Sequence, residues 1–120
     1  MTQRLRILDG TFVIESPASE PAPGTFWIAQ VRAPEGLTVI RESVPGNGAE
    51  RWLAIYGDES AHALDVPGML AAIVTPLADA AIPVFVTSTG RADLVFIPEQ
   101  FKSVAVSALR AAGHTFAKCP

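Results

Sequence analysis

Few residues of this 120-residue chain are of the types that carry out acid–base, nucleophilic or metal chemistry. Neither His62 nor His114 has a cysteine, a second histidine or paired carboxylates at the spacing of a metal site. Ser60, His62 and Asp65 do not form a persuasive catalytic triad, because nothing nearby orients the imidazole or supplies an oxyanion site. We therefore expect both histidines at the surface, no metal or cofactor, and no enzymatic activity.

The stretch Leu64–Ile73, LDVPGMLAAI, favours a different chemistry, the binding of an anion. Asp65 suits the cap of a helix and Pro67 suits its first turn. Gly68 has no Cβ, so a ligand can approach the backbone closely. The unpaired N–H groups at the start of such a helix form a site for a carboxylate or phosphate. Asp65 also has a purely structural interpretation as a cap, and Gly68 as a residue that lets the helix pack tightly on a sheet.

The elements around this stretch alternate regularly from residue 51 onward. Apolar runs at 52–56, 83–89 and 93–97 predict strands, and 115–117 predicts a last short strand. The first helix is predicted from apolar residues at helical spacing: Met69, Leu70, Ile73, Val74 and Leu77. Pro76 lies inside this pattern and predicts a kink or an irregular last turn. A second helix begins at Pro98 and ends at Gly113, so the order is β-α-β-β-α-β, the ferredoxin-like arrangement.

The first fifty residues contain strand signals and no clear helix. Asp9-Gly10, between 4–8 and 12–15, predicts a hairpin, and a single bent strand with a bulge at Gly10 is the alternative. Two more strands are expected at 25–32 and 37–41. The predicted fold class is therefore α+β, with a smaller mostly-β lobe at residues 1–49 and a βαββαβ lobe at residues 50–120.

Composition excludes several classes of function. The net charge of −3 and the pI of about 5.2 argue against nucleic-acid binding. No apolar run approaches the roughly 20 residues that span a bilayer, so no membrane association is expected. Cys119 is the only cysteine, which rules out an internal disulfide. We expect a cytoplasmic protein.

The second half resembles an ACT domain, a small-molecule sensing module. The resemblance lies in Asp65–Ile73, in AIPV at 81–84, and in VFVTST at 84–89 with Asp93 and LVFI behind it. With the ending ALRAAGH at 108–114, the chain is similar to small bacterial ACT proteins related to the CASTOR-type arginine sensors. In those proteins a reduced ACT-like N-terminal lobe precedes a full ACT lobe, which implies the same division here.

The resemblance implies an amino-acid-like effector held between lobes or subunits. Contacts carry over to the backbone of Gly68 and Met69, to Ser88 and Thr89, and to Asp93 as partner of a basic ligand group. The complete candidate site is Asp65, Val66, Pro67, Gly68, Met69, Ser88, Thr89, Gly90 and Asp93. Gly90 departs from the family, which usually has an aromatic residue there, and so does Pro83, where Asn or Ser is common. Ser88 and Thr89 are equally well explained as strand residues, and Asp93 as a turn residue.

Two functions remain. The first is a regulatory module that binds a small, amino-acid-like effector and forms a homodimer. It would signal to a protein partner by a change at a lobe or subunit interface. The alternative is an ACT-like dimerisation or scaffold protein that binds no effector. Open sheet edges would support self-association in either case.

Overall fold

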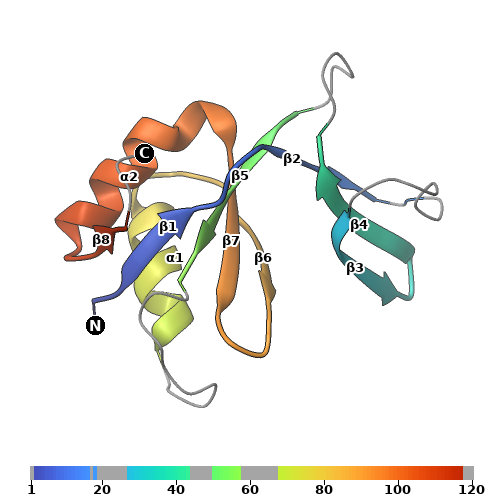
Figure 1. Ribbon diagram of the computed structural model, residues 1–120, viewed down its shortest axis with the longest axis horizontal. Helices are drawn as coiled ribbons and strands as arrows, with labels where there is room; N and C mark the ends of the chain where they lie inside the picture. Colours follow the sequence, from blue (N-terminus) through green and yellow to red (C-terminus); the bar gives the residue numbers. More distant parts are fainter. Residues whose placement is uncertain (1, 17, 19–26, 44–49, 58–67, 118–120) are drawn as a thin grey trace.

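The computed structural model describes residues 2–16, 18, 27–43, 50–57 and 68–117, and its elements follow the predicted order closely. They are β1 (Arg4–Ile7), β2 (Phe12–Glu15), β3 (Trp27–Ala33), β4 (Gly36–Glu42), β5 (Trp52–Tyr56), α1 (Met69–Asp79), β6 (Phe85–Ser88), β7 (Asp93–Pro98), a 3-10 turn at Glu99–Phe101, α2 (Lys102–Ala111) and β8 (Thr115–Phe116). The β-α-β-β-α-β order predicted for the second half is confirmed (Figure 1).

The strands of the second half form one sheet that also contains β1. β7 lies between β5 and β6 and is antiparallel to both. β1 pairs with β5 on one side, antiparallel, and with β8 on the other, parallel. The order across this sheet is therefore β8-β1-β5-β7-β6. A strand from the first residues of the chain thus separates the first and last strands of the β-α-β-β-α-β unit.

The hairpin predicted at Asp9-Gly10 is wrong, and the bent-strand alternative is correct. Both β1 and β2 pair with β5, at Ile7↔Ile55 and at Phe12↔Trp52. Between these two pairs, four residues of one strand (8–11) oppose two of the other (53–54), which is an irregularity of the bulge type. Gly10 has the positive φ of 86° that the sequence suggested, but it bends the strand instead of reversing it. Beyond the bend, β2 continues alongside β4, which forms a hairpin with β3.

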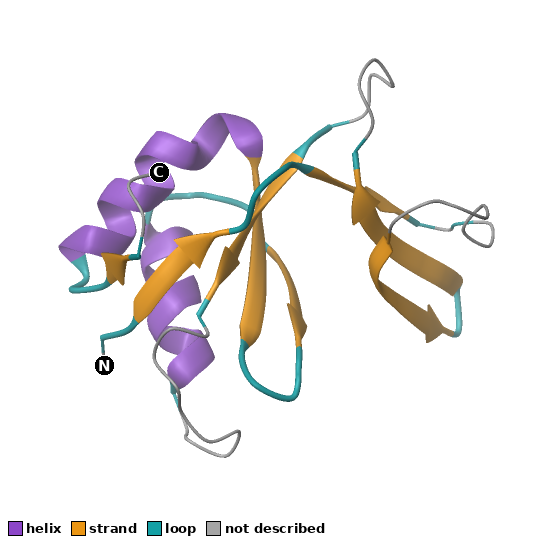
Figure 2. Cartoon of the chain, in the orientation of Figure 1, coloured by secondary structure: helices purple, strands orange, loops and turns teal. Residues whose placement is uncertain are grey.

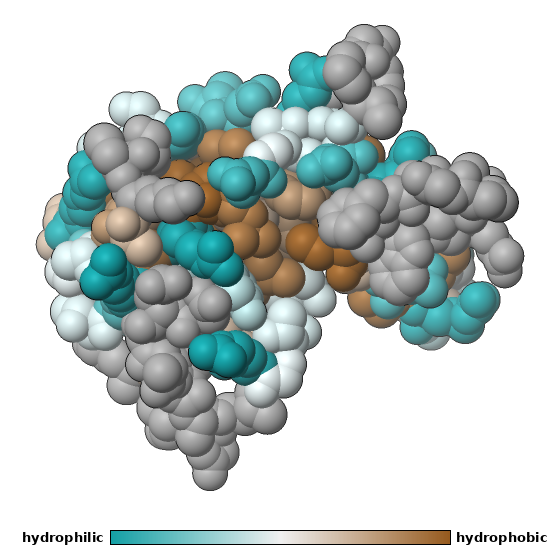
Figure 3. Space-filling model, in the orientation of Figure 1, coloured by the Kyte–Doolittle hydropathy of each residue, from teal (hydrophilic) through white to brown (hydrophobic). Residues whose placement is uncertain are grey.

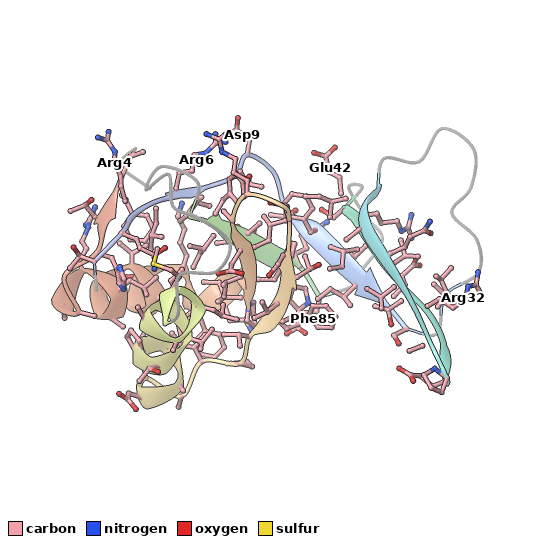
Figure 4. The ribbon with its side chains drawn as sticks, turned by 90° about the horizontal axis from the view of Figure 1, so that it is seen from below. Arg4, Arg6, Asp9, Arg32, Glu42 and Phe85 are labelled. Atoms are coloured by element: carbon pink, nitrogen blue, oxygen red, sulfur yellow. The ribbon has the colours of Figure 1, made fainter. Side chains whose placement is uncertain are left out.

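Both helices cover one face of the sheet (Figures 1 and 2). Apolar side chains of β2, β3 and β4 pack against the other face. The helix-side core includes Leu5, Ile55, Ile73 and Leu109, all at most 1% exposed. A second cluster on the opposite face joins Phe12 and Ile40 to residues of β5 and β7. Figure 3 shows apolar residues gathered at the centre of that opposite face. The side chains of Arg4 and Arg6 project on the same side, as alternation about the buried Leu5 requires (Figure 4).

α1 begins later than the sequence predicted. Its first residue is Met69, and Gly68, with φ of 85°, occupies the capping position. The predicted apolar stripe is confirmed, since Met69, Ile73 and Leu77 are buried. The helix continues three residues beyond Pro76, to Asp79. In α2 the helical spacing of the apolar residues predicts Val104 on the buried face. This prediction is wrong, because Val104 is 49% exposed and Val106 is buried instead.

Candidate functional site

Topology brings the start of α1 and the β6–β7 turn to the same end of the sheet. β5 and β6 run in the same direction, because both are antiparallel to β7. Tyr56, the last residue of β5, and Ser88, the last residue of β6, therefore lie at the same end of the sheet. The side chain of Gln3 connects this end of β5 to α1. Its Nε2 donates a hydrogen bond of 2.9 Å to the carbonyl of Met69, and its Oε1 lies 3.2 Å from where a Cβ on Gly57 would be. The helix therefore starts against the end of β5.

The predicted residues at this end also share a face. Val86 and Val95 pack into the core beneath the helices. Side chains alternate along a strand, so Ser88 and Asp93 point to this same helix-covered side. We call the group formed by Gly68, Met69, Ser88 and Asp93 the corner.

Within the part of the chain that the structure describes, no side chain caps the first backbone donors of α1. Gly68 makes no side-chain cap, and the first turn of α1 contains no acidic residue. A Cβ added to Gly68 would meet nothing within 4 Å, so the space beside the backbone is open. Met69 is buried, and its side chain belongs to the core. The first-turn N–H groups of a helix N-terminus are suited to bind an anion.

The strand part of the corner is organised by short-range hydrogen bonds. Ser88 Oγ donates to Asp93 Oδ1 across the strand pair, at 2.6 Å, and the Ser88 side of this contact is exposed. The hydroxyl of Thr89 accepts from the amides of Arg91 and Ala92 and donates to the Ala92 carbonyl. Thr89 thus stabilises the turn, and Gly90 is exposed at its tip. Asp93, which is half-buried, is the charged group of the corner.

The other predicted site residues, Asp65, Val66 and Pro67, lie outside the described part of the chain. His62 lies outside it as well. Within the described ranges, no group of three or more His, Cys, Asp or Glu side chains could hold a metal ion. No helix there is long and apolar enough to cross a membrane.

Sequence reasoning missed a groove between the β3–β4 hairpin and β6. Its volume is about 380 Å³. One wall is the face of the hairpin that carries Ala29, Val31 and Thr38, and the other is formed by Phe85, Val86 and Thr87 of β6. In Figure 4, Phe85 lies between the main sheet and the hairpin. The alternation of β3 could have indicated an apolar face, but not what it would oppose.

The expectation that His114 is a surface residue is wrong. Its side chain is 3% exposed and lies between the start of the chain and α1. No sequence signal distinguishes this histidine from a solvated one, because its partners are 42 and 111 residues away.

Comparison with known proteins identifies the fold and the family. A family profile described as an ACT domain matches residues 47–111. The structure of Atu0741 from Agobacterium tumefaciens is similar over 97% of this chain and 92% of that one, with a TM-score of 0.77 and 20% identity. VC0802 from Vibrio cholerae, a protein of unknown function, has a TM-score of 0.74 and 24% identity over the same shares of the two chains. No curated protein matches. The family match covers more than half of the 120 residues, and the chain therefore belongs to the ACT domain family.

Proposed function

We propose that this protein is a regulatory module that binds an amino-acid-like effector at the corner. ACT domains are in general regulatory modules that bind small molecules, which supports the class of function. The observation that carries the proposal is that the start of α1 and the pair Ser88–Asp93 lie at one end and on one face of the sheet. Binding would then shift the population of two arrangements at a lobe or subunit interface.

The charges of the corner favour an effector with a carboxylate and a basic group. The first-turn amides of α1 are suited to the carboxylate. Asp93 is suited to an ammonium or guanidinium group, and a guanidinium can bind a carboxylate through two hydrogen bonds. Arginine and lysine are therefore the first candidates, in agreement with the resemblance to arginine sensors.

The test is thermal unfolding of the purified protein with each of the standard amino acids at millimolar concentration. A ligand at 100 times its dissociation constant, bound only by the folded state, adds about 2.7 kcal/mol of stability. This corresponds to a shift of several degrees in Tm for a domain of this size. We expect the largest shift with a basic amino acid.

The matched variants are Asp93→Asn and Asp79→Asn. Asparagine at 93 keeps an oxygen that accepts from Ser88 Oγ, so the turn is retained while the charge is removed. Asp79→Asn makes the same change at the exposed far end of α1. The shift should disappear with the first variant and persist with the second. If the shift survives Asp93→Asn, the effector binds elsewhere, and if no amino acid shifts Tm, the effector proposal is wrong.

A second candidate is the dimerisation or scaffold function, and an open strand edge favours it. Among the described residues β6 pairs with β7 alone, so its outer edge is unpaired. The Thr89 amide donates to the Ala92 carbonyl. Hydrogen-bonded pairs alternate in an antiparallel ladder, so the backbone groups of Val86 and Ser88 point outward from β6. Such an edge can add a strand from another chain.

A further inference from the structure

Pro76 leaves one carbonyl of α1 without its helical donor. In an α-helix the carbonyl of residue i accepts from the amide of residue i+4. The partner of the Ala72 carbonyl would be residue 76, and proline has no N–H. A buried carbonyl without a partner would destabilise the helix by about 1–3 kcal/mol. The helix nevertheless continues to Asp79.

His114 occupies the place of the missing donor. Its Nε2 lies 2.7 Å from the Ala72 carbonyl oxygen, and its side chain is 3% exposed. Its other ring nitrogen, Nδ1, accepts a hydrogen bond of 3.1 Å from the backbone amide of Gln3. Because Nδ1 accepts, the ring proton of the neutral imidazole is on Nε2, which donates to Ala72. The ring is thus held at both nitrogens.

Gln3 holds the preceding turn of the same helix. Its side-chain amide donates to the Met69 carbonyl, and the residue is 5% exposed. The Gln3 carbonyl accepts from the amide of Thr115. Met69 and Ala72 belong to the first four residues of α1, so Gln3 and His114 together attach the start of α1 to the start of β1 and to the segment after α2.

We propose that Gln3 and His114 act as a clasp that positions the start of α1, with His114 supplying the hydrogen bond that Pro76 cannot. Both are positioning residues for the corner, and this part of the inference rests on the proposed function. The clasp makes the position of Gly68 depend on β1, so movement of the N-terminal strand changes the anion-binding end of α1. Pro76 makes this dependence necessary, because the helix cannot satisfy the Ala72 carbonyl by itself.

The first experiment measures the tautomer of His114 directly, by nitrogen-15 NMR of the ring in the unmodified protein at neutral pH. We expect the proton on Nε2 and none on Nδ1. A proton on Nδ1 would contradict the clasp, because that nitrogen could not then accept from Gln3. This measurement requires neither a variant nor a ligand.

The second experiment is a double-mutant cycle between His114→Phe and Pro76→Ala. Phenylalanine supplies an aromatic ring without the two nitrogens, whereas alanine at 76 restores an N–H that can reach the Ala72 carbonyl. We expect His114→Phe to lower the folded-to-unfolded ratio about tenfold or more, and to lower it less in the Pro76→Ala background. If only the double variant folds, the rescue itself supports the inference. Equal losses in both backgrounds, or failure of Pro76→Ala to restore folding, would overturn it.

The third experiment tests positioning, by amide hydrogen exchange in Gln3→Ala and in the control Gln30→Ala, an exposed glutamine of β3. We expect exchange at 72–75, the first amides of α1 that bond within the helix, to accelerate about tenfold in Gln3→Ala, while exchange at 105–109 in α2 stays unchanged. Gln30→Ala should change neither. Uniform acceleration across both helices, or none in α1, would overturn the positioning role.

A parallel arm measures the Tm shift with arginine in the same two variants. We expect Gln3→Ala to reduce the shift and Gln30→Ala to preserve it. If no amino acid stabilises the wild-type protein, the proposed function is wrong. The clasp is then tested by the tautomer and exchange measurements, which need no ligand.

Discussion

Phe12 and Phe96 form a contact between the N-terminal stretch and the second half of the chain. Phe12 of β2 is 3% exposed and Phe96 of β7 is fully buried. Their rings pack edge to face, with centroids 5.7 Å apart and an interplanar angle of 81°. This geometry is favourable for aromatic rings beyond the area that they bury. A residue from the predicted N-terminal lobe is thus part of the packing against the second half.

Phe12→Ala should therefore destabilise the whole protein. We expect a loss of about 3–5 kcal/mol in the free energy of unfolding, because the truncation removes a buried ring and leaves a cavity. Chemical denaturation measures it. Val104→Ala, at a residue that is 49% exposed, is the control and should change stability by no more than about 0.5 kcal/mol. A loss for Phe12→Ala as small as the control would show that β2 contributes little to the core.

At the scale of elements, β6 is an edge strand of the sheet among the described residues. One edge pairs with β7, while the other has no strand partner among the described residues and borders the groove of about 380 Å³. Edge strands are a common route to self-association unless they are protected. The scaffold candidate therefore makes a prediction about this one edge.

Val86→Pro should convert an oligomer formed through β6 into monomers. The amide that it removes points outward, so the ladder with β7 is retained. Thr87→Pro is the matched control, since its amide points toward β7 and its loss should cost about 1–3 kcal/mol. Sedimentation and thermal unfolding distinguish the two effects. If Val86→Pro has the same oligomeric state as wild type, β6 is not the association edge.

At the scale of the whole molecule, β1 makes the two ends of the sequence interdependent. It lies between β5 and β8, and its Leu5 is fully buried in the helix-side core. The clasp residue Gln3 immediately precedes it. A boundary near residue 49 therefore separates stretches of sequence that share one sheet.

Residues 50–120 alone should not fold cooperatively. Without β1, the edges of β5 and β8 lose their partners, and the core loses Leu5. Circular dichroism and thermal melting of this fragment provide the measurement. Adding a peptide of residues 1–16 should restore a cooperative transition. A fragment that melts cooperatively by itself would show that β1 is dispensable.

Local patterns predicted much of this structure because their causes are local. Alternation and helical spacing depend on neighbours along the chain, so the β-α-β-β-α-β order, the buried stripe of α1 and the positive φ of Gly113 at the end of α2 were predictable. The grouping of Ser88 and Asp93 also follows from their places on paired strands. Whether this group binds an effector stays a prediction.

The tertiary structure alone decided which distant segments meet. The residues around Gly10 are compatible with a hairpin or a bend, and pairing of both β1 and β2 with β5 selects the bend. The sequence contains His114 and Pro76 without any sign that one compensates for the other. Their relation depends on a contact between α1 and the segment after α2, because only folding brings the imidazole to the carbonyl that proline leaves unpaired.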